Sequence, residues 1–218
     1  MGADSEHWAD YYAVTVARPA WRTVQLAIDK FRAEDETGGR GDAVAAAGDS
    51  ATRPARFAVD LGCGAGRDTR ALLRAGWRVL AVDREPAARE ALEAAVEPDF
   101  RSRLTIHIED LATVTVPTAD LVNANLALPF LAPDQFRPTW RRIVAALRPG
   151  SRFAAMVFGD HDESASDPEM TCLAPEQVRA ALSGFEIEHW SVEEDDGPTA
   201  LGDPHHFHLV EFVARRTP

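Results

Sequence analysis

The feature that most constrains this chain is an apolar stretch that runs directly into three alternating glycines. Residues 57–61 have the composition of a buried strand, Gly62, Gly64 and Gly66 follow, and residues 68–75 favour a helix. Glycine permits a tight turn and lets backbone N–H groups approach a ligand closely, while the N-terminus of the next helix attracts negative charge. A strand, a glycine turn and a helix in this order predict a nucleotide-binding α/β fold.

The glycine spacing separates two classes of nucleotide-binding protein. The dinucleotide fingerprint has glycine at the first, third and sixth positions, but the sixth position counted from Gly62 is Arg67. The pattern instead reads Asp60-x-Gly62-x-Gly64-x-Gly66, with a carboxylate ahead of the turn that could meet a cationic group of a ligand. In this form it resembles the first motif of the class I S-adenosylmethionine (SAM) dependent methyltransferases.

A second strand and its acidic end fit the same nucleotide-binding unit. Residues 77–82 read as a short buried strand, and Asp83 closes it 21 residues after Gly62. A carboxylate at this place can accept hydrogen bonds from both ribose hydroxyls. Pro86 then opens a predicted helix whose apolar residues recur at helical spacing.

Two further predicted strands end in residues that the resemblance assigns to the site. An alternating strand over 104–108 leads to Asp110 and Leu111, and a strand over 119–122 leads to Asn123. The resemblance implies that Asp110 reaches the adenine amino group, that Leu111 lies against the ring, and that residues near Asn123 face the substrate. Because ligands of open α/β sheets bind outside the carboxyl ends of the strands, we expect these side chains to converge.

The resemblance covers residues 55–160 most specifically. It implies a Rossmann-like, doubly wound α/β fold with a seven-stranded, mostly parallel sheet and an antiparallel C-terminal strand pair, for which 185–192 and 207–213 alternate as strands. It also implies SAM as the cofactor and S-adenosylhomocysteine as its product. The residues expected to bind the cofactor are Arg18, Asp60, Gly62, Cys63, Gly64, Gly66, Asp83, Arg84, Asp110, Leu111 and Asn123.

The N-terminal segment 8–19 is dense in aromatic residues and carries Arg18 directly before a proline. In small-molecule methyltransferases of the tellurite-resistance type, which this chain resembles, such a segment folds over the cofactor. By that likeness Arg18 would pair with the methionyl carboxylate, and Tyr11 or Tyr12 would wall the methyl-transfer site, with Tyr12 as a catalytic candidate. The alternative is that the tyrosines only anchor the first helix.

The length of 218 residues fits one domain with a single well-buried core. We expect residues 1–34 to form a helical cap, because apolar residues recur at helical spacing from Trp21. Residues 35–54, rich in Gly, Ala, Asp and Ser, read as a flexible linker, and residues 55–218 as the Rossmann-like core.

Three histidines near the C-terminus raise the question of a metal. Strand alternation places His206 and His208 on one face and His205 on the other, so at most two could share an ion, without a carboxylate at fixed spacing, and we expect no metal. His206 or His208 could instead be a substrate contact or a proton acceptor, and His206 is the second catalytic candidate. A structural histidine is the alternative. A fifth predicted strand over 152–158 leads into a polar turn, where Asp160 or His161 could contact substrate or simply solvate the loop.

The connection between the last two predicted strands, residues 193–204, begins with four consecutive carboxylates and is long for a hairpin. Long loops inside compact domains are often lids or binding loops. A solvated run of charge is the more common explanation, so we assign these carboxylates no site role.

Composition argues against several partners and locations. The net charge of −12, without a basic stripe, argues against DNA or RNA substrates. The two cysteines, Cys63 and Cys172, give neither a disulfide framework nor zinc spacing, and Cys63 is expected to contribute its backbone and a small buried thiol. With no secretion signal and no run of about 18 apolar residues, we expect a cytoplasmic protein without membrane contact.

These observations predict transfer of a methyl group from SAM to a small-molecule acceptor by in-line displacement. The reaction depends mainly on alignment, because the leaving thioether needs no proton. The sequence identifies neither a decisive base, nor the acceptor atom, nor the oligomeric state. The alternatives are a non-catalytic SAM-binding regulatory protein and an NAD-dependent oxidoreductase, although the latter should carry Tyr-x-x-x-Lys or another catalytic lysine, and Lys30 is the sole lysine.

Overall fold

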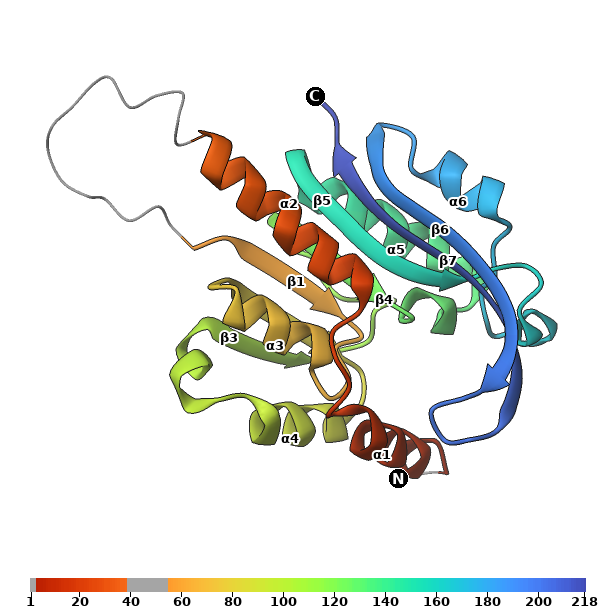
Figure 1. Ribbon diagram of the computed structural model, residues 1–218. Coiled ribbons are helices and arrows are strands. Elements are labelled where there is room, and N and C mark those ends of the chain that lie inside the picture. Colours follow the sequence, from red (N-terminus) through yellow and green to blue (C-terminus); the bar gives the residue numbers. More distant parts are fainter. Residues whose placement is uncertain (1–2, 39–54) are drawn as a thin grey trace, which may run out of the picture.

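The computed structural model describes residues 3–38 and 55–218, which form one mixed sheet with helices on both faces (Figure 1). The strand order is β3-β2-β1-β4-β5-β7-β6, and neighbouring strands are parallel except where β7 is one of the pair. The predicted seven-stranded, mostly parallel sheet with antiparallel C-terminal strands is confirmed. The strands are β1 Phe57–Leu61, β2 Arg78–Asp83, β3 Leu104–Ile108, β4 Ala119–Asn125, β5 Leu147–Phe158, β6 Phe185–Pro198 and β7 Pro204–Arg216.

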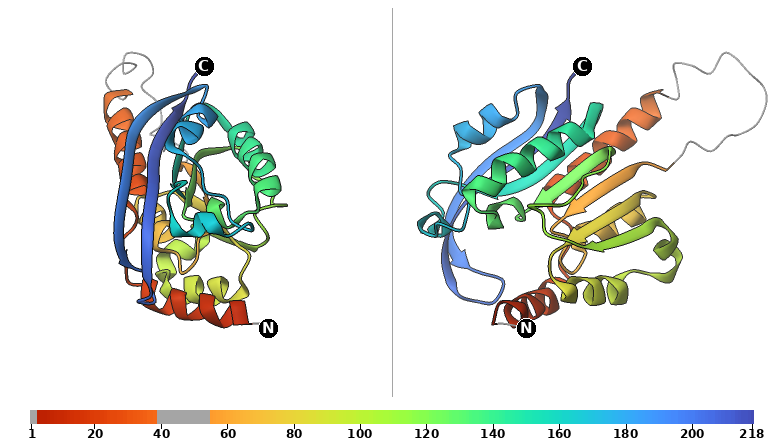
Figure 2. Two further views of the ribbon diagram at one scale, coloured as in Figure 1. Left: turned by 90° about the vertical axis from the view of Figure 1, so that its right-hand side faces the viewer. Right: turned by 180° about the vertical axis from the view of Figure 1, so that it is seen from behind.

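Helices cover both faces of the sheet (Figure 2). Helices α2, α3 and α4 bury apolar residues such as Phe31, Leu72 and Leu92 against one face, and α5 and α6 bury Ile143 and Val178 against the other. No helix in the described part of the chain is long and apolar enough to cross a membrane. The helices are α1 Ala3–Thr15, α2 Arg22–Gly38, α3 Arg67–Arg74, α4 Pro86–Ala95, α5 Pro133–Ala146 and α6 Pro175–Ala181, with short 3₁₀ turns η1 Pro98–Arg103, η2 Leu128–Phe130 and η3 Glu163–Ser166.

The strand order reverses between β1 and β4, and the turn after β1 occupies the point of reversal. The N–H groups of Gly62 and Cys63 both donate to the carbonyl oxygen of Val82, at 2.8 and 3.0 Å. Gly62 has a φ of +68°, and a Cβ there would overlap the Cβ of Ala127. Both the backbone conformation and the available space therefore require glycine at this position.

The predicted end of the N-terminal cap differs from the structure. Helix α2 continues to Gly38, beyond the end at residue 34 predicted for the cap, and residues 39–54 of the predicted linker lie outside the described residues. Helix α5 ends at Ala146, and the following Arg148, Pro149 and Gly150 belong to β5. The physical reason is that a residue before proline is disfavoured in the helical conformation.

The long connection predicted over residues 193–204 is mostly strand, so only 199–203 join β6 to β7. His206 lies opposite Asp196 in the pairing, and its ring nitrogens lie 2.7 Å from Asp196 Oδ1 and 3.2 Å from Glu194 Oε1. These contacts, that with Asp196 first, raise the pKa of the exposed His206 imidazole. The long-loop prediction is wrong because a partner on β7 compensates the acidic run of β6.

Arg152 ties helix α2 to the antiparallel end of the sheet. Its side chain is 2% exposed, Nη2 lies 2.7 Å from Glu34 Oε1 of α2, and Nε lies 2.6 Å from Glu188 Oε2 of β6. The guanidinium also stacks over the ring of Phe31, 4.3 Å from its centroid. The pKa of Glu34 is lowered, chiefly by its hydrogen bond with Arg152.

Replacing Arg152 with Met should lower the free energy of unfolding by about 3 kcal/mol, because it leaves Glu188 without its cation in a nearly buried place. Urea denaturation with linear extrapolation measures the change. Arg32→Met is the control, since that guanidinium pairs with Asp29 at the surface and its loss should cost less than about 0.5 kcal/mol. Equal losses for the two variants would contradict the structural role of Arg152.

Candidate functional site

A cavity of about 500 Å³ opens at the carboxyl ends of the central strands. Helix α1 and the tip of the β6–β7 hairpin lie near each other at this edge of the sheet (Figure 1), and residues from both line the cavity. On the side of β1 and β2, its lining contains the glycine turn and the polar strand ends, and we call this side the cofactor end. On the side of β5 and β7 is the aromatic end, lined by Trp8, Tyr11, Phe130, Phe158 and Phe207.

Most residues predicted for the site meet in this cavity. Two do not line it, namely Gly66 and His206. A Cβ at Gly66 would overlap Leu92 of α4, so this glycine permits close packing below the turn. The predicted residues that line the cavity are Tyr12, Arg18, Asp60, Gly62, Cys63, Gly64, Asp83, Arg84, Asp110, Leu111 and Asn123.

Asp83 is buried at the end of β2 and accepts three hydrogen bonds. The Gly64 N–H donates to Oδ2 at 2.8 Å, and the Glu85 N–H and the Tyr12 hydroxyl donate to Oδ1 at 3.0 and 3.2 Å. The carboxylate therefore fixes the glycine turn relative to β2 while it faces the cavity.

Tyr12, a candidate for the wall of the methyl-transfer site, lines the cavity beside the glycine turn. Its ring lies against Gly64, where a Cβ would come within 3.2 Å of Tyr12 Cε1, and the residue is 4% exposed. Burial first, and then the neighbouring Asp83 carboxylate, raises the pKa of the Tyr12 hydroxyl far above its ordinary value. The hydroxyl stays protonated and donates to Asp83, so it cannot serve as a base.

A buried network of carboxylates and amides joins β1, β4 and α3. Asn123 Nδ2 donates to Asp60 Oδ1 at 2.8 Å and to Asp68 Oδ2 at 3.0 Å, and Asn125 Nδ2 donates to Asp68 Oδ2 at 2.8 Å. Thr69 Oγ1 donates to Asp60 Oδ2 at 2.5 Å. Four of these side chains, all but Thr69, line the cavity, which places two carboxylates beside the glycine turn.

Sequence reasoning missed Asp68 and Asn125 as site residues. Asp68 stands in the first turn of α3, two positions after Gly66, and Asn125 lies two positions after Asn123 on the same face of β4. Strand alternation could have identified Asn125. Asp68 had no comparable signal, because an acidic residue in a first helical turn is common for dipole reasons alone.

Burial raises the pKa of Asp60 to about 7, and the nearby Asp68 carboxylate is the second cause. Hydrogen bonds from Thr69 and Asn123 act in the opposite direction. Burial first, then Asp83 and Asp60, also raises the pKa of the Cys63 thiol, so this buried thiol stays protonated. Cys63 therefore behaves as a small buried residue near the turn.

The remaining predicted cofactor residues lie around the cavity rim. Asp110 is exposed after β3 and Leu111 beside it is buried. Arg84 forms an exposed ion pair with Glu85 at 3.4 Å. Arg18 is exposed, and no hydrogen bond or ion pair with another described residue fixes its guanidinium.

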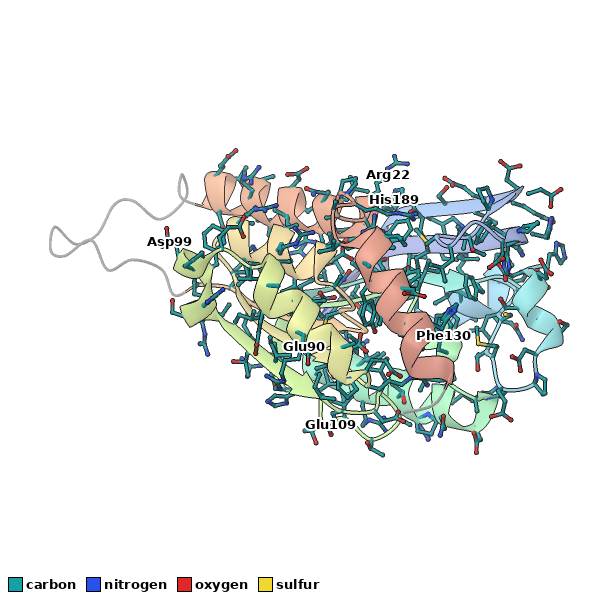
Figure 3. All side chains as sticks on the ribbon, turned by 90° about the horizontal axis from the view of Figure 1, so that it is seen from below. Arg22, Glu90, Asp99, Glu109, Phe130 and His189 are labelled. Carbon is teal, nitrogen blue, oxygen red and sulfur yellow. The ribbon has the colours of Figure 1, made fainter. Side chains whose placement is uncertain are left out.

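The aromatic end joins residues from both termini of the chain. Trp8 lies edge-on to Phe130 with ring centroids 5.2 Å apart, and Phe130 is 6.2 Å from Phe158 in the same way. Figure 3 shows Phe130 beside α1. Of these five aromatic residues only Tyr11 was a sequence-based candidate for the wall, although Phe130 and Phe158 do follow strand ends.

As alternation predicts, His205 lies on one face of β7, and His206 and His208 lie on the other. The face toward the cavity is that of His205, not that of the predicted catalytic candidate His206. His205 lines the cavity with Phe207, whereas His206 points away and contacts Asp196 and Glu194 at the surface. His205 Nε2 lies 2.9 Å from Oδ1 of Asp162, a carboxylate with 0% exposure. Selecting His206 as catalytic is therefore wrong in position, because only pairing with β5 determines which face of β7 turns inward.

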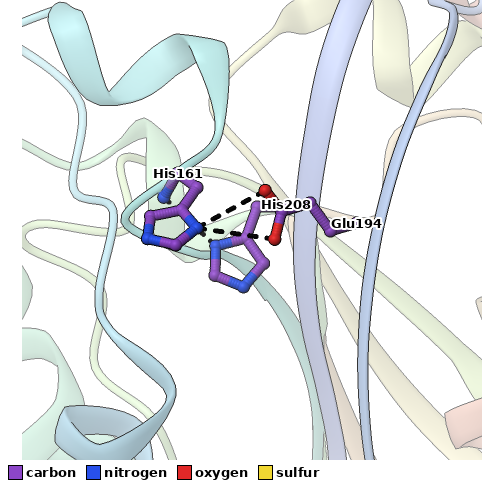
Figure 4. Close-up of side chains that lie close together, drawn as sticks. All are labelled: His161, Glu194 and His208. Atoms are coloured by element: carbon purple, nitrogen blue, oxygen red, sulfur yellow. Dashed lines mark hydrogen bonds and ion pairs between the residues drawn. The ribbon is translucent and has the colours of Figure 1, made fainter.

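His161, Glu194 and His208 lie close together, with Glu194 and His208 on the face of the hairpin opposite to His205 (Figure 4). Glu194 supplies the carboxylate that sequence spacing could not reveal, since it lies opposite His208 in the β6–β7 pairing. The two imidazole rings stack with centroids 4.8 Å apart, and His208 Nδ1 already accepts the N–H of His161 at 3.1 Å. Glu194 is also shared with His206.

Comparisons with known proteins agree with the geometry. Residues 59–153 match the model of a family described as a methyltransferase domain. TehB from Haemophilus influenzae is similar in structure at 15% identity, with a TM-score of 0.63 over 84% of this chain and 67% of that one. The N-methyltransferase NodS from Bradyrhizobium japonicum, solved with S-adenosyl-L-homocysteine, is similar at 16% identity, with a TM-score of 0.58 over 75% of this chain and 79% of that one.

Among curated proteins, carboxy-S-adenosyl-L-methionine synthase from Cronobacter sakazakii is 30% identical over 104 residues, which is 45% of this chain and 42% of that protein. The chain thus matches less than half the length of such relatives. The match to the methyltransferase domain family therefore covers residues 59–153, the part of the chain that holds most of the glycine-turn strand and the next three strand ends of the site.

The raised pKa of Asp60 has a consequence for stability. Between its unfolded value near 4 and its folded value of about 7, the folded state binds more protons than the unfolded state. The free energy of unfolding should therefore fall as pH rises from 5 to 7.5, by at most about 1.4 kcal/mol per pH unit from this group.

Urea denaturation across that range measures this, and Asp60→Asn should flatten the fall relative to the unmodified protein. Asp134→Asn, at an exposed site of α5, should leave the pH dependence unchanged. An identical slope in Asp60→Asn would show that another group causes it.

Proposed function

We propose that this protein transfers a methyl group from SAM to a small-molecule acceptor held at the aromatic end of the cavity. The observation that carries the proposal is a single cavity in which a glycine turn and strand-end carboxylates face an aromatic wall. Such a cavity can order two reactants against each other, which is the main requirement of methyl transfer.

The residues of the cofactor end fit SAM in charge and geometry. Asp83 is a buried acceptor at the place where a ribose would bind, and Asp110 offers an exposed carboxylate for an adenine amino group. Asp60 and Asp68 give a negative potential where the cationic part of SAM would lie. The unpaired guanidinium of Arg18 is available to a carboxylate.

SAM, when bound, supplies a methyl group on a positively charged sulfur. The protein's own contribution is to hold and orient the two reactants and to exclude water from the cavity. Asp83 and the N–H groups of the turn hold one end of the site rigid, and α1 with the hairpin tip covers it. Aromatic walls limit water at the acceptor, which strengthens electrostatic interactions inside.

The aromatic end of the cavity favours an acceptor that is aromatic or apolar and that is neutral or positively charged. Three arginines line the cavity, Arg18, Arg67 and Arg84, and all three come from the N-terminal segment or the cofactor end. Arg67 is already held, since its Nε donates to the Pro19 carbonyl at 2.8 Å and it stacks on Trp21. The lining residues from β5 to β7, residues 158–209, include Asp203 and Ser164 but no lysine or arginine, which does not suit an acidic acceptor on that side.

This proposal is tested first by calorimetric titration with SAM, S-adenosylhomocysteine and NAD in parallel. Micromolar binding of SAM and S-adenosylhomocysteine, without binding of NAD, supports the proposal. Binding of NAD alone would favour the oxidoreductase alternative. Incubation with SAM and a panel of phenols, thiols and amines should then yield S-adenosylhomocysteine. Mass spectrometry of the cofactor separates that product from a carboxylated SAM, and binding without turnover on any acceptor would support a regulatory protein.

Asp83→Asn should weaken SAM binding by roughly 10- to 100-fold, because hydrogen bonds to a charged group are worth about 1.5–3 kcal/mol. Calorimetry gives the affinity, and Asp134→Asn should leave it unchanged. An affinity unaffected by Asp83→Asn would remove Asp83 from the ribose contact.

A further inference from the structure

We propose that His205 and Asp162 form a proton-accepting dyad, and that the acceptor is therefore a molecule with an ionisable hydroxyl, a phenol by class. This rests on the proposed methyl transfer and names its acceptor chemistry. Neither residue belongs to the glycine turn or to the strand ends that the family resemblance identifies.

Asp162 is the anchor of the dyad. Its side chain has 0% exposure, and three donors converge on its carboxylate. Oδ1 accepts from the Ser164 N–H at 3.0 Å and from His205 Nε2 at 2.9 Å, and Oδ2 accepts from the His208 N–H at 3.0 Å. A buried carboxylate needs such donors to remain charged, and two backbone N–H groups fix its position, so it presents a set direction to the imidazole.

His205 stands between this anchor and the aromatic end. Its side chain is 17% exposed, it lines the cavity, and its ring lies 4.5 Å from that of Phe207. Because Nε2 donates to Asp162, the neutral tautomer leaves the lone pair on Nδ1. The exposed Glu163 carboxylate lies 3.6 Å from Nδ1, beyond hydrogen-bond distance.

The chemistry of the dyad follows from these contacts. As the acceptor oxygen forms its bond to the methyl carbon, its O–H bond breaks and the proton passes to Nδ1 of His205. The electron pair of the broken carbon–sulfur bond remains on sulfur as a neutral thioether. Asp162 stabilises the imidazolium, which later returns the proton to water.

Two observations together favour a phenol: it requires a base, and the cavity wall beside the dyad is aromatic. A thiolate or a heterocyclic nitrogen can attack the methyl group without a base. For such acceptors the dyad at the aromatic end would not contribute to the reaction. An aromatic hydroxyl matches both the ring-lined wall and the base. Positioned acid or base groups typically contribute 10²- to 10⁴-fold to rate.

The test compares phenols of different acidity in the full-length protein with SAM. In assays at a mildly alkaline pH of about 8.5, His205→Gln should lower kcat for 4-methylphenol by about 10²-fold or more. It should have a much smaller effect for 4-nitrophenol, which is largely ionised at that pH whereas 4-methylphenol is not. Asp162→Asn should show the same selective loss, as a positioning residue that acts through the imidazole. A merely structural role would lower both rates equally.

Matched variants separate the outcomes. His107→Gln, at an exposed position of edge strand β3, should change neither rate, and SAM affinity should be the same in all variants. Three outcomes would overturn the dyad but not the proposed function. They are no selective loss in His205→Gln, a selective loss in His206→Gln, and methylation of thiols and amines but of no phenol. Failure to bind SAM, or no methyl transfer to any acceptor, would overturn the proposed function as well.

Discussion

The structure depends on one buried hydrogen-bond network at the point where the strand order reverses. Asn123 bridges the carboxylates of Asp60 and Asp68, and so links the ends of β1 and β4 to the start of α3. Two carboxylates beside each other are unfavourable unless donors satisfy them. The network satisfies them and leaves them facing the cavity, so the same contacts that align the strands also set the charge of the site.

Features that were predicted from the sequence are those with a local cause. The turn at Gly62 requires a positive φ, and Asp83 closes an apolar strand, so both are visible in short stretches of residues. The strand order follows from the family pattern, and the proline at the first position of α4 gives its start. These elements were predicted correctly because each depends on its own neighbours.

Features that were missed depend on pairing across the chain. The alternation of His205 and His206 was correct, but which of them faces inward follows from the register of β7 with β5. The acidic stretch of β6 was read as a loop because its partner, His206, lies ten or more positions away. Tyr12 was read as catalytic because nothing near it in sequence reveals that Asp83 accepts its hydroxyl. The two halves of the site differ in this respect, since the cofactor end is built from local motifs and the aromatic end from tertiary contacts.

Strand β7 separates two environments over consecutive residues. His205, Phe207 and Leu209 line the cavity, while His206 and the buried His208 lie on the opposite face of the strand, near Glu194 and His161. Because side chains alternate with a period of two, a slip of one residue against β5 would exchange the two sets. Such a slip would bring His206 and His208 into the cavity and move the ring of Phe207 out of it. Lengthening the connection 199–203 leaves this register intact, whereas deleting a single residue within 205–209 inverts it, so natural variation in length should be confined to the hairpin tip.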